Sequence, residues 1–229
     1  MDKDDLVAFK NAVCSNDLPE VGRMLREAPV RAEARDDSGV SFLLTALYHG
    51  HIEVADLIAS VRERLDIFEA AAMGKLGEVR SFLQGDLEVV NSLSPDGFTA
   101  LHLACFFGKI GVVRFILAHG GDVGAVARNP SAVQPLHSAA ATGSESVVRV
   151  ILAAGADPDA KQAGGHTALH SAVIHGNVAM AIALMASGAD PAVANDEGKS
   201  AMDLDPRANP EAIKAVLKKW IDMRECAAE

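Results

Sequence analysis

Three histidines recur along this chain at nearly constant spacing, and their side chains are the first that could do chemistry. They are His102, His137 and His170, and the steps between them are 35 and 33 residues. Imidazole is the commonest metal ligand in proteins and a frequent general acid or base. Each histidine follows a leucine and precedes an alanine by two residues, so all three belong to a repeated unit. A period of this length is typical of stacked repeat arrays.

The geometry of a stacked array argues against a metal site at these histidines. Neighbouring helices pack about 8–10 Å apart, whereas zinc lies about 2.0–2.1 Å from each nitrogen that binds it. Histidines of adjacent units therefore cannot share one ion. Among the five other histidines, His49, His51, His166 and His175 have no spacing that would bring several ligands together. We expect capping and core roles for the repeated histidines, and no bound metal.

The sequence also gives no support for catalysis. Cys105 occupies a position that we expect to be buried between helix layers, whereas a reactive thiol needs an accessible, electropositive setting. The chain contains no Gly-x-Ser-x-Gly, His-Glu-x-x-His or phosphate-loop motif. The pairs Gly120-Gly121 and Gly164-Gly165 are interpreted as turn glycines. We expect no catalytic residues, no cofactor and no enzyme activity.

Turn and capping residues around each histidine predict two short helices in every unit. Residues 94–97, Ser-Pro-Asp-Gly, have the composition of a turn. Thr99 is suited to cap a helix over about 100–107, and the histidine three residues later can complete a capping box. Gly108 ends that helix, and an amphipathic pattern predicts a second helix over about 110–119.

The motif that carries these helices has a family resemblance. Asp96 to Ala104, which reads Asp-Gly-Phe-Thr-Ala-Leu-His-Leu-Ala, and the later triplet Gly188-Ala189-Asp190 resemble the ankyrin repeat, whose motif has a Thr-Pro-Leu-His core. The resemblance implies paired antiparallel helices joined by β-hairpin fingers, in a family whose members bind proteins. The fold class is therefore expected to be all-α, an α-solenoid of about seven stacked ankyrin-type helix-turn-helix repeats with short β-hairpin fingers.

The repeat pattern extends over nearly the whole chain, which is treated as a single solenoid, 1–229. Terminal units are expected to be atypical because their outer faces meet water. In the last unit, the first helix should carry Asp203 and the second should span about 210–223. The expected units are an N-terminal cap (1–35), a second unit (36–64), a third without its leading hairpin (65–93), three central units (94–127, 128–161, 162–194) and a C-terminal cap (195–223).

One spacing departs from the period. Gly50 and Gly74 are 24 residues apart, whereas Gly74 and Gly108 are 34 residues apart. The missing residues are those of a finger, so a tight helix-to-helix turn near Asp66 should replace the hairpin. The resulting gap is either a tolerated deletion, a seam between subdomains or a notch in a binding surface.

Composition and charge limit the partners. Hydrophobic residues make up 49% of the chain and aromatic residues only 4%, which suits thin, closely packed helices. The formal charge of −10 disfavours nucleic acid, which requires clustered cations. Cys14, Cys105 and Cys226 are widely spaced and odd in number, which favours reduced thiols. With no apolar stretch long enough to span a membrane and an acidic start unlike a signal peptide, a cytoplasmic location is expected.

The expected binding surface consists of positions that recur without serving the stack. The resemblance implies that the two residues before the glycine of each first helix face the concave wall, and that fingertips line its edge. Scarce aromatic residues at such positions indicate contact with a protein or peptide, although one phenylalanine could instead tuck between helices and Tyr48 could pack on the seam. The candidates are Tyr48, His49, Met73, Phe106, Phe107, Thr142, Ile174 and His175 on the wall, and Asp96, Phe98, Arg128, Asn129, Gln134, His166 and Glu197 on the fingers.

Two further features leave alternatives open. The finger over 127–134 is two residues longer than its neighbour, which is either a specificity loop or an accident of loop length. Trp220, the only tryptophan, is expected to seal the last unit, with docking of a partner or a second copy as the alternative. The expected function is a protein-binding scaffold or regulator that is monomeric. A self-associating structural protein that uses the cap or the wall is the alternative.

Overall fold

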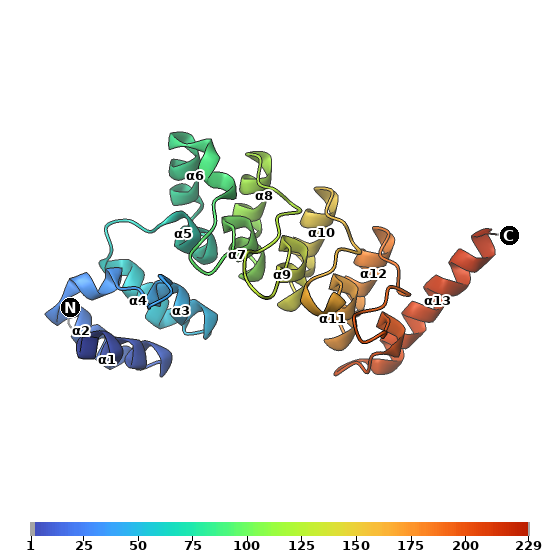
Figure 1. Ribbon diagram of the computed structural model, residues 1–229, viewed down its shortest axis with the longest axis horizontal. Helices are drawn as coiled ribbons and strands as arrows, with labels where there is room; N and C mark the ends of the chain where they lie inside the picture. The colour runs from blue at the N-terminus through green and yellow to red at the C-terminus, as the bar shows by residue number, and fades with distance from the viewer. Residues whose placement is uncertain (1–2, 229) are drawn as a thin grey trace.

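The computed structural model describes the backbone of residues 3–228 and the side chains of residues 4–223. The side chain of Cys226 and the outermost residues of the expected 1–229 solenoid lie outside these described parts, whereas Cys14 and Cys105 are free thiols. The described chain is an elongated row of helices (Figure 1). The helices are α1 (Lys3–Cys14), α2 (Leu18–Glu27), α3 (Phe42–Tyr48), α4 (Ile52–Val61), α5 (Ile67–Met73), α6 (Leu76–Gly85), α7 (Ala100–Phe106), α8 (Ile110–Ala118), α9 (Pro135–Ala141), α10 (Glu145–Ala153), α11 (Ala168–Ile174), α12 (Val178–Ala186) and α13 (Pro210–Ala228).

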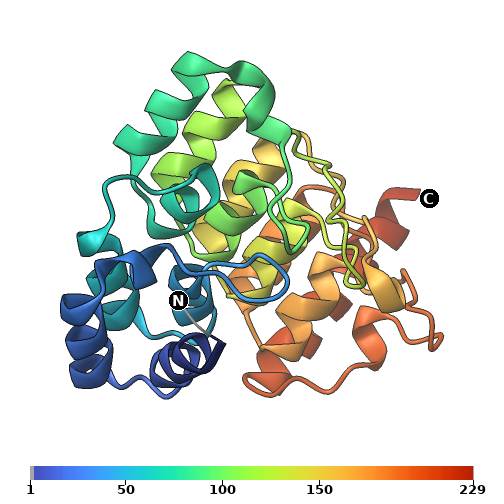
Figure 2. The same cartoon turned by 60° about the vertical axis from the view of Figure 1, so that its left-hand side comes forward.

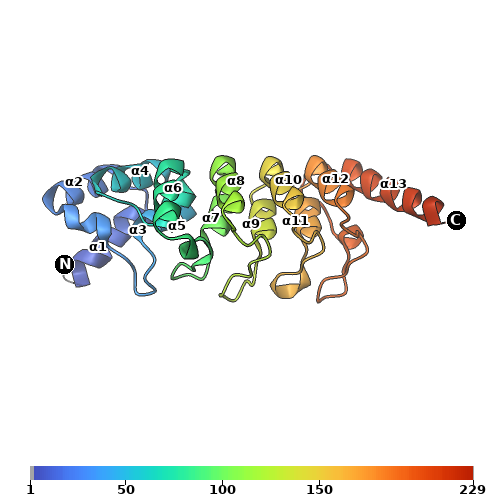
Figure 3. The same ribbon diagram turned by 90° about the horizontal axis from the view of Figure 1, so that it is seen from above.

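The helices form two layers with a row of loops along one side. Each odd-numbered helix from α1 to α11 packs against the helix that follows it and against the odd-numbered helices of neighbouring pairs. Seen from above, the loops that lead into α3, α7, α9 and α11 and the loop after α12 project to the same side, next to the odd-numbered helices (Figure 3). With the N-terminal end turned forward, the helices drawn green to orange lie partly one behind another, whereas the N-terminal helices, drawn blue, lie below the green ones (Figure 2). The expected all-α solenoid is confirmed; the exact unit boundaries stay predictions.

The repeated histidines cap their own helix and bind the next unit. Thr99 and His102 form the expected capping box at the start of α7. The Nδ1 atom of His102 accepts a hydrogen bond from the Thr99 backbone N–H, 3.3 Å away, so its proton lies on Nε2. That Nε2 donates to the Val133 carbonyl oxygen, 3.0 Å away. His137 and His170 repeat the arrangement, with Nε2 bound to the carbonyls of Ala160 and Lys199.

Apart from the connection between α4 and α5, the loops between pairs are short hydrogen-bonded fingers. In the described residues they contain no named β-strand, only isolated antiparallel bridges between Arg35 and Ser41 and between Leu93 and Thr99. Neighbouring fingers are joined by backbone bonds, such as Arg128 N–H to the Gly97 oxygen at 2.9 Å. Gly97 has φ +86°, and a Cβ there would lie 2.5 Å from the Arg128 oxygen, so this contact requires glycine. The longer finger closes through a bond from Ala127 N–H to the Val133 oxygen.

The terminal pairs differ from the central ones. Asn16, which stands where other units have glycine, adopts φ +58° between α1 and α2. At the other end, the expected first helix of the last unit is only a 3₁₀ turn over Ala201–Asp203, because Leu204 leaves the helical region at once. The expected end of the second helix near Met223 was too early, since α13 continues to Ala228 and extends away from the row (Figure 1).

The connection between α4 and α5, residues 62–66, contains no finger. Charged side chains occupy the space instead. Arg62 pairs with Glu69, and their side chains are only 4% and 0% exposed. Glu69 also completes a capping box with Asp66, so it takes the place that histidine has in the central units. Asp66 in turn pairs with Arg35 of the preceding finger, 2.9 Å away.

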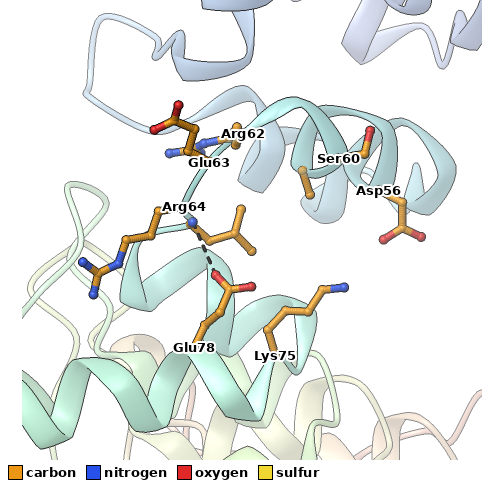
Figure 4. Close-up of a pocket in the computed structure, with 9 residues that line it drawn as sticks. Asp56, Ser60, Arg62, Glu63, Arg64, Lys75 and Glu78 are labelled. Carbon is orange, nitrogen blue, oxygen red and sulfur yellow. Dashed lines mark hydrogen bonds between the residues drawn. The ribbon is translucent and has the colours of Figure 1, made fainter.

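A cleft of about 440 Å³ opens beside this connection. Its lining is charged and comes from the end of α4, the connection and the start of α6 (Figure 4). The Leu65 N–H donates to Glu78 across it, 3.4 Å away, and the Arg64 guanidinium lies 4.2 Å from the centre of the Phe82 ring. The shortened connection, which we call the seam, thus combines these charged contacts with the continuous apolar core, to which Leu65 and Ile67 belong; whether it is a tolerated deletion, a subdomain boundary or a notch in a binding surface stays a prediction.

The buried histidines make stability depend on pH. Burial lowers the pKa of His102, His137 and His170 below the ordinary value. The unfolded chain, with an imidazole pKa of about 6.5, then binds protons that the folded chain does not. Stability should be full well above pH 6.5 and should fall as the pH drops through about 6.5 toward the lowered pKa values of the folded imidazoles. Urea denaturation followed by circular dichroism measures the change. His137→Ala should weaken the dependence and His175→Ala, at an exposed site, should not; equal slopes would contradict this origin.

The seam generates a second prediction. Arg62→Ala leaves the Glu69 carboxylate buried without its partner, which should reduce the free energy of unfolding by about 3–5 kcal/mol. Arg23→Ala is the matched control, because the Arg23 side chain is 52% exposed and pairs with Glu20 and Glu27 on the surface. Arg23→Ala should reduce the free energy of unfolding by no more than about 1 kcal/mol. Similar losses in the two variants, measured by chemical denaturation, would contradict a structural role for the buried pair.

Candidate functional site

Three aromatic side chains from two non-adjacent units form one cluster. Tyr48 is the last residue of α3, Phe106 is the last residue of α7, and Phe107 follows it. The Tyr48 ring stacks on Phe107 with a centroid distance of 5.8 Å and meets Phe106 edge-on at 6.3 Å. The two phenylalanine rings are 5.1 Å apart and nearly perpendicular. These are the distances and orientations that aromatic pairs prefer.

The unit between them allows this contact because its residue at the corresponding position has a small side chain. In α5, Ala72 stands at the position that Tyr48 and Phe106 hold in their own helices, counted from the glycine that follows each. Ala72 is fully buried, so its short side chain leaves room for the rings on either side to meet. The missing finger contributes as well, because Gly39 of one finger approaches Pro95 of the next so closely that a Cβ on Gly39 would lie 3.2 Å from the proline Cβ. The shortened seam therefore brings the two units together at the wall.

A fingertip carboxylate completes the cluster. The Tyr48 hydroxyl donates to Asp96 Oδ2, 2.7 Å away, and the Ser94 hydroxyl donates to Asp96 Oδ1. The fingertip itself is held by its neighbour, since Asn129 Nδ2 donates to the Asp96 backbone oxygen at 2.8 Å. Asp96 is thus fixed by contacts on both sides of its finger.

These side chains border an apolar hollow of about 320 Å³. We call it the aromatic pocket. It opens between α3, α7, α9 and the finger that precedes α7. It is lined by Tyr48, Asp96, Phe98, His102, Leu103, Phe106 and Ser138.

The phenol of Tyr48 is held in its neutral form. Burial of the hydroxyl raises its pKa well above the ordinary value, and the hydrogen bond to Asp96 and the negative charge of that carboxylate raise it further. The residue as a whole is 37% exposed. Tyr48 therefore offers a ring edge to a ligand while its hydroxyl serves as a fixed donor to Asp96.

The structure brings some of the expected site residues together and leaves others apart. Tyr48, Asp96, Phe98, Phe106 and Phe107 gather at the aromatic pocket. Asn129 supports it from the next finger. The remaining candidates lie elsewhere: His49, Thr142, His175, Arg128 and Glu197 are exposed, whereas Met73, Ile174, Gln134 and His166 are half-buried. Whether any of them contacts a partner stays a prediction.

Three pocket residues were not among the expected ones. His102, Leu103 and Ser138 lie about one helical turn before the wall positions of their helices. Leu103 and Ser138 occupy the same position in successive units, directly after the repeated histidine. The change from a large to a small side chain there leaves space beside Phe106. That change is visible in the sequence and could have indicated the hollow.

The described residues contain neither a metal cluster nor a membrane span. Across them, no group of three or more histidine, cysteine or carboxylate side chains is arranged to hold a metal ion. The same part of the chain has no helix with both the length and the hydropathy needed to cross a membrane. Cys105 is fully buried, and burial raises the pKa of its thiol, as expected for a core residue.

The stacked helix pairs and their fingers define a solenoid of helical repeats. A family model described as ankyrin repeats in three copies matches residues 67–162 and 127–195. Together these matches cover more than half of the chain, and the protein belongs to the ankyrin repeat family. Ankyrin repeats are in general protein–protein interaction modules.

Curated relatives share only short stretches with this chain. It is 37% identical over 60 residues to palmitoyltransferase akr1 of Schizosaccharomyces pombe, covering 26% of this chain and 9% of that protein. It is 35% identical over 98 residues to serine/threonine-protein kinase TNNI3K of Mus musculus, covering 38% and 12%. It is 37% identical over 76 residues to DNA-binding protein RFXANK of Homo sapiens, covering 33% and 29%. The matches span well under two thirds of these relatives, so they do not carry over a whole-protein activity.

The environment of Tyr48 can be measured directly, because it is the only tyrosine. In an ultraviolet titration of the folded protein, the tyrosinate band should appear only well above the ordinary pKa of about 10. Asp96→Asn removes the negative charge next to the hydroxyl and should bring the transition to lower pH, although burial still acts. Asp37→Asn removes a carboxylate from another finger and is the control. A transition at the ordinary pH in the folded wild type would contradict the Tyr48–Asp96 contact.

Proposed function

We propose that this protein is a non-catalytic binding module, a scaffold or regulator, that engages a partner protein or peptide through the wall and fingers around the aromatic pocket. The observation that carries the proposal is the pocket itself, where scarce aromatic rings border an apolar hollow instead of closing it. Exposed apolar hollows of this kind usually mark interaction sites. Aromatic side chains are also enriched among the residues that dominate binding energy.

The rigidity of the site supports the same function. Asp96 is fixed from two fingers, and Tyr48 is held by stacking and by its hydroxyl. Side chains that are already ordered lose little conformational entropy on binding. A partner would therefore gain most of the contact energy that the surface offers.

Self-association is a second candidate, favoured by the C-terminal cap. The indole N–H of Trp220 is buried without a hydrogen-bond partner among the described residues. Met202 and Met223 are 43% and 49% exposed, and a hollow of about 450 Å³ is lined in part by Met202, Leu217 and Ile221. A second copy of the chain could cover this surface.

One capture experiment separates the two candidates. Immobilised wild type, a Tyr48→Ala/Phe106→Ala variant and an Ile52→Ala/Ile182→Ala variant would each be incubated with lysate to which an untagged copy of the chain is added. Ile52 and Ile182 are exposed apolar residues on the outer helices α4 and α12, so their replacement is the matched control. The three proteins should first show equal helicity and equal thermal midpoints.

The outcomes have distinct meanings. A protein retained by the wild type and the control variant but lost from the pocket variant supports the proposed module. Retention of the untagged chain alone, independent of the pocket, supports self-association. Identical sets of heterologous proteins on all three baits would contradict binding through the aromatic pocket.

A further inference from the structure

The carboxylate of Asp96 lacks a cation. It is half-buried at the rim of the aromatic pocket and accepts hydrogen bonds only from two neutral hydroxyls, those of Tyr48 and Ser94. Arg35 on the preceding finger is already paired with Asp66. Within the described part of the chain, no lysine, arginine or histidine forms an ion pair with Asp96. A half-exposed carboxylate that has no counter-ion can accept charge-assisted hydrogen bonds from a cationic group of a binding partner.

The acceptor capacity of Asp96 is also only partly used. An ionised carboxylate has about four lone-pair directions, two on each oxygen. Tyr48 takes one on Oδ2 and Ser94 takes one on Oδ1. One acceptor direction therefore remains on each oxygen. This is the pattern that a planar guanidinium satisfies with two parallel hydrogen bonds, whereas an ammonium group acts as a point charge.

The rest of the pocket suits the stem of a long cationic side chain. The rings of Tyr48, Phe98 and Phe106 border it, and its volume of about 320 Å³ lies in the range of small binding sites. Guanidinium groups pack favourably on aromatic rings. The protein contains such contacts of its own, with Arg64 lying 4.2 Å from the centre of the Phe82 ring and Arg80 lying 5.4 Å from that of Phe115.

We propose that the aromatic pocket binds an arginine side chain from a basic peptide segment of the partner. The guanidinium lies on Asp96, and the methylene groups lie against Tyr48, Phe98 and Phe106. The net charge of −10 favours the approach of such a segment at low ionic strength. This inference rests on the proposed binding function, and it specifies the chemistry of the residue that the pocket recognises.

The only tyrosine provides the readout for a test. The full chain, labelled with ¹³C at tyrosine, gives one set of ring signals, and those signals come from the pocket. Capped pentapeptides with a central arginine, lysine, leucine or glutamate between serine and glycine residues serve as probes. The arginine peptide should shift the Tyr48 signals at the lowest concentration, the lysine peptide should bind more weakly, and the leucine and glutamate peptides should bind least.

Two variants distinguish specific recognition of arginine from nonspecific binding. Asp96→Asn should weaken binding of the arginine peptide about tenfold or more, the loss expected for a charge-assisted hydrogen bond. Asp37→Asn changes the net charge equally but at an exposed residue of another finger, and it should have little effect. If Asp96→Asn lowers the thermal midpoint, Phe98→Leu replaces it as the test: this variant keeps the carboxylate and should weaken the arginine peptide but not the leucine peptide.

Three results would overturn the proposal. They are binding of the leucine peptide as tight as that of the arginine peptide, equal binding by Asp96→Asn and wild type, and no shift of the Tyr48 signals by any peptide. None of them would by itself remove the proposed binding function. That function fails only if capture is unchanged in the Tyr48→Ala/Phe106→Ala variant.

Discussion

The repeated imidazoles link each of three central units to the finger that follows it by a buried hydrogen bond. A single pair of short helices cannot bury its apolar face alone, so each unit is stable only against its neighbours. His102 uses one ring nitrogen to cap its own helix and the other to bind the next finger. The bond fixes the helix relative to the adjacent finger, and repeating it at His137 and His170 gives successive units the same register. Wall and fingertip positions therefore recur along the array.

The seam between α4 and α5 shows the effect of changing this link. Glu69 keeps the capping function of the histidine but turns to Arg62 in the preceding connection instead of to a later finger. A buried ion pair then replaces the hydrogen bond between neighbouring units, and the finger is lost. Since Ala72 is small, Tyr48 can contact Phe106 and Asp96 across the intervening unit. The most distinctive surface of the protein is thus a consequence of its least regular unit.

Local rules were sufficient to predict the helices but not this contact. The Thr99 cap and the glycine-terminated helices depend on neighbours within a few residues, and the sequence displays those neighbours. Burial of Cys105 follows from the place of its position in the repeated unit. The last unit was less predictable because propensity did not reveal that Leu204 leaves the helix after a single turn. The Tyr48–Asp96 bond joins residues 48 positions apart. It depends on how the seam stacks, which no spacing in the sequence specifies.

The residues that pack successive units together differ from those that form the binding surface, and this difference explains how one fold can acquire a specific site. The inward faces of the helices and the histidines fix the array, and substitutions there cost stability. Fingertips and the last turn of each inner helix are constrained less, because their side chains contribute little to the stack. At the aromatic pocket the two sets meet: His102 belongs to the stack and also lines the hollow. The hydrogen bond from His102 to the next finger therefore also fixes one of the side chains that line the pocket. The side chains of Tyr48, Phe98 and Asp96 determine what the pocket can bind.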